Sequence, residues 1–171
     1  MLSVLSRFNR STFFWVGLII TCLALEGTAL FYQYVLEYGP CVLCVHIRAW
    51  VLGIMLAAVL GLFLRHSRLG LVLANAATLL FTAGMVERSY RTLGTERGWF
   101  EGTCSMNPNY PAWLRLDEWL PAVFKPLEAC GYTPWVIPEL LSMAEALMLF
   151  SVGLAAVMLF LLLSSLLHSD K

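Results

Sequence analysis

Four long apolar segments constrain what this chain can fold into more than any other feature. They cover residues 13–34, 42–64, 69–86 and 146–167. Each is long enough to cross about 30 Å of hydrocarbon as a helix, which takes roughly 17–25 residues. Helices satisfy their own backbone hydrogen bonds, and four segments are too few to close a barrel. We therefore predict an all-α membrane protein, a four-helix transmembrane bundle that forms a single domain over residues 1–171.

Composition favours the same class. Hydrophobic residues make up 60% of the chain and charged residues 13%, whereas soluble domains are roughly half apolar and a quarter charged. The formal net charge is zero, so we expect a lipid bilayer and no nucleic acid among the partners. The first apolar segment is too long for the core of a signal peptide, roughly 7–15 residues, and lacks a cleavage site, so a cleaved leader is not expected.

The connections between the segments predict an orientation. Arg7 and Arg10 precede the first segment, and the short turn at residues 65–68 is basic. The positive-inside rule places these parts, and with them both termini, in the cytoplasm. The long loop at residues 87–145 then lies on the opposite side of the membrane. Arginines close to the third segment favour the reverse orientation weakly.

Part of the long loop has a helical pattern. Residues 112–129 place their charged side chains on one arc of a helical wheel and these apolar side chains on the other: Trp113, Leu116, Trp119, Leu120, Val123 and Phe124. Such a stretch is typical of a short helix that lies along a membrane surface. A cap packed on the ends of the bundle is an equally good and compatible interpretation. Pro121 and Pro126 are expected to split the stretch into short turns.

A Cys-x-x-Cys pair, Cys41 and Cys44, opens the second apolar segment. The start of a helix carries partial positive charge and free N–H groups, which favour a thiolate. Arg48 lies one turn after Cys44 on the same helix face, and its charge would stabilise a thiolate further. An arginine that merely reaches for the lipid headgroups is the alternative.

Two further cysteines, Cys104 and Cys130, lie in the long loop. On the oxidising side of a membrane such a pair is expected to form a disulfide. The pair could staple the loop, or it could exchange with the membrane pair in a relay. A zinc site is not expected, because the loop cysteines are 26 residues apart with no histidine between them. The fifth cysteine, Cys22, is interpreted as packing.

A thiol relay requires a final electron acceptor. The sequence contains no haem motif, no GxGxxG loop and no cysteine-rich cluster motif. A lipid-soluble two-electron carrier, a quinone, suits a dithiol at the edge of the membrane, since Cys44 and Arg48 provide a thiolate and a cation there. Glu26, in the first segment, is interpreted as pairing with a polar group inside the bundle.

These motifs resemble one family. The stretch PCVLC with Arg48 four residues later, LALE at residues 23–26, the two lone loop cysteines and WLRLDEWLPAVF at residues 113–124 are similar to the disulfide bond formation protein B (DsbB) family of bacterial inner membranes. The resemblance covers essentially the whole chain. It implies a quinone-dependent thiol oxidoreductase with redox sites at the periplasmic face, which supports disulfide formation in secreted proteins.

The resemblance also implies a role for each site residue. Cys104 and Cys130 would form the loop disulfide that oxidises the thioredoxin-fold periplasmic oxidant DsbA, with Cys104 in the mixed disulfide. Cys130 would then exchange with Cys41, and Cys44 would meet ubiquinone, or menaquinone without oxygen. Arg48 would stabilise both the thiolate and the cofactor.

Arg91 stands where family members often carry a histidine, and its guanidinium could donate to a quinone oxygen. Two alternatives remain at this stage. The chain could be a non-catalytic membrane subunit with structural disulfides, or a paralogue with a different dithiol partner.

Overall fold

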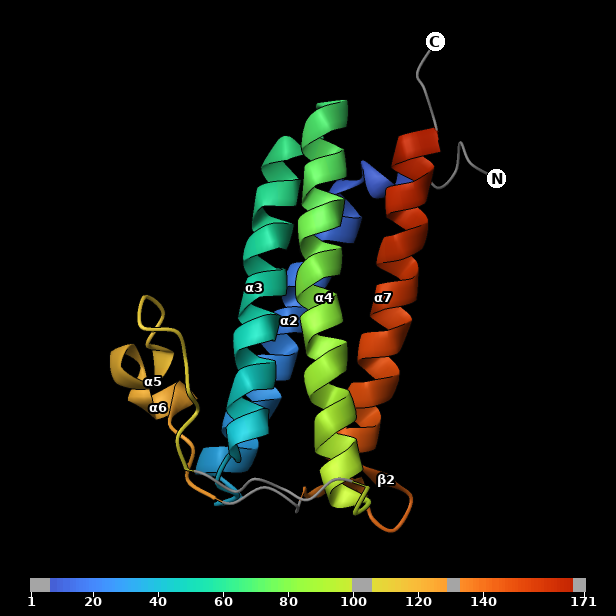
Figure 1. Cartoon of the computed structure of the whole chain (residues 1–171). Coiled ribbons are helices and arrows are strands. Elements are labelled where there is room, and N and C mark those ends of the chain that lie inside the picture. Colours follow the sequence, from blue (N-terminus) through green and yellow to red (C-terminus); the bar gives the residue numbers. More distant parts are fainter. Residues whose placement is uncertain (1–6, 100–105, 129–132, 168–171) are drawn as a thin grey trace.

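A computed structural model describes residues 7–99, 106–128 and 133–167. Four long helices lie side by side as a bundle (Figure 1): α2 (Thr12–Tyr34), α3 (Val42–Leu64), α4 (Arg68–Glu96) and α7 (Met143–Leu167). Each is long and apolar enough to cross a membrane. The predicted class, an all-α four-helix membrane bundle, is thereby confirmed. Helix α2 begins and α7 ends at the same end of the bundle (Figure 1).

Glycines allow α3 and α4 to pack closely. A Cβ atom on Gly53 would lie 2.6 Å from the Phe81 ring, and one on Gly84 would lie 2.7 Å from the Trp50 ring. Each glycine thus faces an aromatic ring of the other helix. Between membrane helices, packing of this kind replaces the hydrophobic driving force that lipid does not provide.

Helix α4 ends later than the apolar segment that predicted it. The apolar segment predicts a helix that stops near residue 86 and a loop that starts at residue 87, but the helix continues to Glu96. Hydropathy detects the part of a helix that suits lipid, and a helix can continue into water on polar residues. The end is set by Gly98 at φ 71°, with Trp99 N donating to Gly94 O at 2.7 Å, as in a Schellman motif.

The long loop contains two short helices instead of one amphipathic rod. They are α5 (Leu116–Trp119) and α6 (Pro121–Phe124), and they lie beside the lower part of α3 in Figure 1. Pro121 is the first residue of α6, so the expected interruption by proline is confirmed there. Leu116 and Phe124 are buried, whereas the Trp113 and Trp119 side chains are exposed. One part of the stretch therefore packs on the protein and leaves the tryptophans outside.

A small hairpin precedes α7, and no pattern in the sequence predicts it. Strand β1 (Trp135–Ile137) pairs antiparallel with β2 (Leu141–Ser142). Strands this short lack the alternation that would reveal them in a sequence. The hairpin lies at the same end of the bundle as the start of α7 (Figure 1).

Candidate functional site

Cys41 and Cys44 lie at the start of α3, as the sequence predicted. Cys41 is the N-cap residue, with an extended backbone, and its Sγ accepts a hydrogen bond from Cys44 N at 3.2 Å. Its side chain is 4% exposed. A sulfur atom that accepts from the first turn of a helix is favoured as a thiolate, because the N–H group and the helix dipole both attract negative charge.

The loop is fastened to the residues that precede this pair. Cys41 forms a parallel β-bridge with Glu128. Leu127 N donates to Pro40 O at 2.9 Å, and Gly39 N donates to Glu128 Oε1 at 3.2 Å. The entry to the cysteine helix is thus paired with a loop segment far away in the sequence. The predicted loop cysteines, Cys104 and Cys130, lie outside the described residues.

Arg48 is buried, with 6% of its surface exposed. One Nη atom donates to Gln33 Oε1 at 2.6 Å and to Val123 O at 2.8 Å, and the other donates to Ala29 O at 3.0 Å. These bonds join α3 to α2 and to α6. An arginine reaching out to lipid headgroups would not be held in this way, so that alternative does not describe Arg48. Its hydrogen bonds offset part of the cost of burying the charge.

A cavity of about 310 Å³ lies against this part of α3. Both Cys44 and Arg48 line it, so the thiol and the cation that the sequence placed one turn apart share one space. Much of the wall is apolar, with Leu25, Val51, Leu147 and Phe150 among its residues. A concave apolar site of this size with a few polar groups is typical of ligand pockets.

Known proteins with similar sequences identify the family. The family model described as disulfide bond formation protein DsbB matches residues 11–161. A protein named disulfide bond formation protein B from Shewanella denitrificans is 32% identical, covering 98% of this chain and 95% of its own length. A protein of the same name from Shewanella frigidimarina is 34% identical, covering 86% of this chain and 88% of its own length. Another, from Haemophilus influenzae, is 30% identical, covering 95% of this chain and 92% of its own length.

The chain belongs to the DsbB family. A DsbB-family chain with four membrane-spanning helices is a disulfide oxidoreductase of the bacterial inner membrane. The family is linked in general to quinones and implies a DsbA-type partner.

The cavity fits the quinone that the DsbB family implies. Such a cofactor needs an apolar slot for its ring, a donor near its carbonyl oxygens and a thiol within reach. The cavity has an apolar wall and is lined by both Arg48 and Cys44. The described residues therefore provide all three requirements in one place.

Arg91 was predicted to contact the cofactor, and the structure does not bring it to this cavity. Its side chain lies on the last turns of α4, is 59% exposed and pairs with Glu87 one turn earlier. The next residue, Thr92, does line the cavity and is buried. Successive residues point about 100° apart around a helix, so the two side chains face different surroundings.

Two residues of α2 join the site: Glu26, for which the sequence predicts a polar partner inside the bundle, and Gln33, which no sequence motif indicates. Glu26 lines the cavity, and its Oε1 atom is buried with no hydrogen-bond partner among the described residues. The expected polar partner is therefore not seen for that oxygen. Together with Ala29, these residues are three, four and seven apart on α2, which is the spacing of one helix face. That spacing of polar residues in an apolar segment was the available signal.

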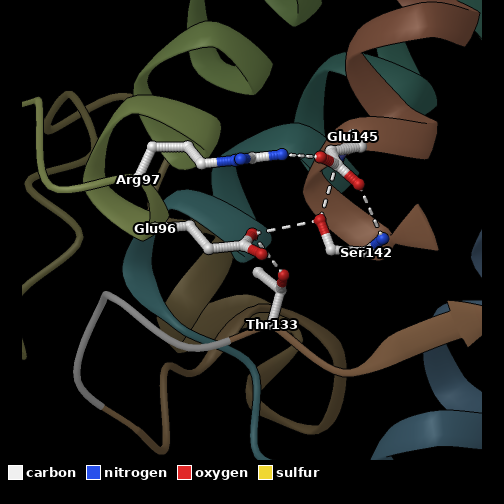
Figure 2. A network of polar contacts seen from close by, with 5 residues as sticks. All are labelled: Glu96, Arg97, Thr133, Ser142 and Glu145. Atoms are coloured by element: carbon white, nitrogen blue, oxygen red, sulfur yellow. Dashed lines mark hydrogen bonds and ion pairs between the residues drawn. The ribbon is translucent and has the colours of Figure 1, made fainter. Parts of the chain in front are cut away.

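A network of polar contacts joins five residues near this end of the bundle (Figure 2). Glu96 Oε2 accepts from Thr133 Oγ1 at 2.6 Å and from Ser142 Oγ at 3.3 Å. Glu145 accepts from Ser142 N at 3.0 Å and pairs with Arg97. The network therefore connects the end of α4, the hairpin and the start of α7. Thr133 also lines the cavity.

A second contact holds the loop on the outer side of α3. Pro108 O lies 2.7 Å from His46 Nε2, and Tyr110 Oη donates to Val45 O at 3.0 Å. The rings of His46 and Tyr110 are 5.2 Å apart, edge to face. Burial raises the pKa of Tyr110, so its hydroxyl keeps the proton that this hydrogen bond requires.

Proposed function

We propose that this chain reoxidises a DsbA-like periplasmic thiol oxidant and passes two electrons to membrane quinone. The observation that carries the proposal is the shared cavity, because Cys44 and Arg48 line one apolar space next to the N-cap cysteine of α3. The net reaction converts a protein dithiol and a quinone into a protein disulfide and a quinol. It would support disulfide formation in secreted proteins.

Electrons would enter through the loop pair. Cys104 would form the mixed disulfide with the partner, and Cys130 would then exchange with Cys41. The β-bridge between Cys41 and Glu128 supports this order. Glu128 precedes Cys130 by two residues, and two residues of chain span at most about 7 Å.

The two membrane cysteines would have different roles in the reaction. Cys41 would act as the exchanging thiol, because the hydrogen bond from Cys44 N stabilises its sulfur as a leaving thiolate. Cys44 lines the cavity and would be the thiolate nearest the cofactor. Arg48 would stabilise that thiolate, and its contacts with α2 and α6 hold the cation in place.

A bound quinone supplies an acceptor of two electrons and two protons. Cys44, Arg48 and the apolar wall of the cavity would hold it. Ubiquinone is the proposed acceptor, with menaquinone in its place when oxygen is absent. Arg65 and Arg68 contact the end of the bundle where α2 begins and α7 ends. By the positive-inside rule this supports cytoplasmic termini and a periplasmic cavity.

Replacing Cys44 tests the relay. Purified protein with Cys44→Ser is given the reduced DsbA-like partner, and quinone reduction is followed by absorbance. We expect turnover to fall at least about 10³-fold, because covalent thiol chemistry has no substitute in serine. Cys22→Ser is the matched control, since Cys22 is buried in the core away from the cavity lining. Undiminished turnover in Cys44→Ser would favour a non-catalytic subunit with structural disulfides.

The partner is tested separately. A paralogue with another dithiol partner would reduce quinone when given a small dithiol but would show a low kcat/KM with DsbA-like protein. We expect the DsbA-like protein to be the better substrate.

A further inference from the structure

One titratable group in the cavity has no role in the thiol relay. Glu26 lies within the membrane-spanning length of α2 and is one of the residues that line the cavity, together with Cys44 and Arg48. Its Oε1 atom is buried and has no hydrogen-bond partner among the described residues. Carboxylates in membrane helices are costly, and those that persist commonly serve as ion-pair partners or in proton pathways.

The contacts of Arg48 argue against a purely structural ion pair. Both Nη atoms of Arg48 already donate to oxygens of other residues, at 2.6–3.0 Å. Among the described residues, no hydrogen bond or ion pair joins Glu26 to Arg48 within contact distance. Arg48 is therefore satisfied without the carboxyl group, although its charge acts on Glu26 across the cavity.

The other polar groups around Glu26 are engaged or unsuited to carry a proton. Tyr32 Oη donates to Trp135 O at 3.3 Å, and Glu128 Oε1 accepts from Gly39 N. Of the described residues, α4 contributes Thr92 to the lining and α7 contributes apolar side chains. Among the described residues, the titratable or charged groups that line the cavity with Glu26 or interact with its charge are Cys22, Tyr32, Tyr38, Cys44, Arg48, Tyr110 and Glu128.

Reduction of a quinone to a quinol consumes protons as well as electrons. Cys44 is needed as the electron donor, and an arginine does not give up its proton in proteins. A carboxyl group exchanges protons readily and is a common general acid. We propose that Glu26 is the proton donor to the quinone in this cavity. The inference rests on the proposed function and adds a residue to it.

The proton balance is complete with this residue. Counted from the two thiols, formation of the Cys41–Cys44 disulfide releases two electrons and two protons, one of which has already left when Cys44 is a thiolate. A quinone takes up the same number of electrons and protons when it becomes a quinol. Glu26 delivers one proton to a quinone oxygen and recovers one of the protons that the thiols release. The second proton is taken from water at the cavity mouth, and the second thiol proton returns to water.

Glu26→Gln tests the proposal because glutamine keeps the shape of the side chain and removes the acid. The protein is first reduced at its cysteines and then mixed rapidly with quinone. We expect quinone reduction to slow by about 10²-fold, the lower range for general acid catalysis, and to lose its dependence on pH. Exchange between the loop cysteines and the reduced partner should keep its rate, which shows that the variant is folded.

Two readouts separate proton donation from binding. The quinone Kd, followed by tryptophan fluorescence, should change less than about twofold in Glu26→Gln, because the proposed role is in the chemical step. Infrared spectra of the quinone-free protein should show a carboxyl band that the glutamine variant lacks.

Glu26→Asp serves as the conservative variant. It retains the acid, so we expect it to reduce quinone at least about tenfold faster than Glu26→Gln. Equally slow quinone reduction in Glu26→Asp and Glu26→Gln would overturn the proposal. So would a wild-type rate in Glu26→Gln, or a loss of quinone affinity in Glu26→Gln as large as its loss of rate. If the wild-type protein itself does not reduce quinone, the proposed function fails and not only this assignment.

Discussion

At the scale of single residues, Arg48 connects sequence, packing and chemistry most directly. Its position one turn after Cys44 is visible in the sequence. Its bonds to Gln33, Ala29 and Val123 are not, because they come from a neighbouring helix and from the loop. The side chain therefore places a cation at the cavity and also links α3 to α2 and α6 by hydrogen bonds.

Arg48→Gln is expected to weaken quinone binding by about tenfold or more. Glutamine removes the charge and cannot make all three hydrogen bonds, and bonds to charged groups contribute about 1.5–3 kcal/mol each. The measurement is the quinone Kd of the purified variant, with its KM in turnover. Arg91→Gln is the matched control, and we expect a change of less than about twofold, because Arg91 is exposed and lies outside the cavity lining. Equal losses in both variants would contradict this assignment.

At the scale of elements, the end of α4 depends on a single glycine. Gly98 has φ 71°, a conformation that side chains with a Cβ atom rarely adopt, and a Cβ there would meet open space. The cost of another residue at this position would therefore come from the backbone alone. The last turns of α4 carry Thr92 and Glu96, so the end of this helix matters to the cavity and to the polar network.

Gly98→Ala is expected to lower the free energy of unfolding by about 1 kcal/mol, the cost of forcing alanine into the left-handed region. Thermal unfolding in detergent measures the change. Gly17→Ala is the control, since Gly17 lies inside α2 and a Cβ there also meets open space. Alanine is the better helix former, so that change should be neutral or stabilising by up to about 1 kcal/mol. A destabilisation of equal size in both variants would contradict the backbone explanation.

At the scale of the whole molecule, two anchors hold the loop against the cysteine end of the bundle. Glu128 is tied to the residues before α3, and Thr133 is tied to Glu96 at the end of α4. The two anchors flank residues 129–132. Contacts between segments that are far apart in the sequence therefore fix the positions of the loop and the hairpin beside the cavity.

Thr133→Val is expected to slow electron transfer from the DsbA-like partner by roughly tenfold, with little effect on quinone Kd. Valine has the same shape but cannot donate to Glu96, and loss of a hydrogen bond to a charged group costs about 1.5–3 kcal/mol. The measurement is the rate at which reduced partner drives quinone reduction. Thr95→Val is the control, because the Thr95 hydroxyl donates only within its own helix, to Arg91 O. A partner-driven rate in Thr133→Val no lower than in Thr95→Val would rule out an anchoring role.

Three properties can be predicted from the sequence: the class of the protein, the start of a helix at Cys41 and the placement of Cys44 and Arg48 on one helix face. These are local properties, because segment length, hydropathy and helical spacing depend on neighbouring residues. Three others depend on the three-dimensional packing: Glu26 lines the cavity, Arg91 does not, and Thr133 and Glu128 hold the loop. Such contacts join residues up to 89 positions apart, and only the packing of the helices and the loop brings them together.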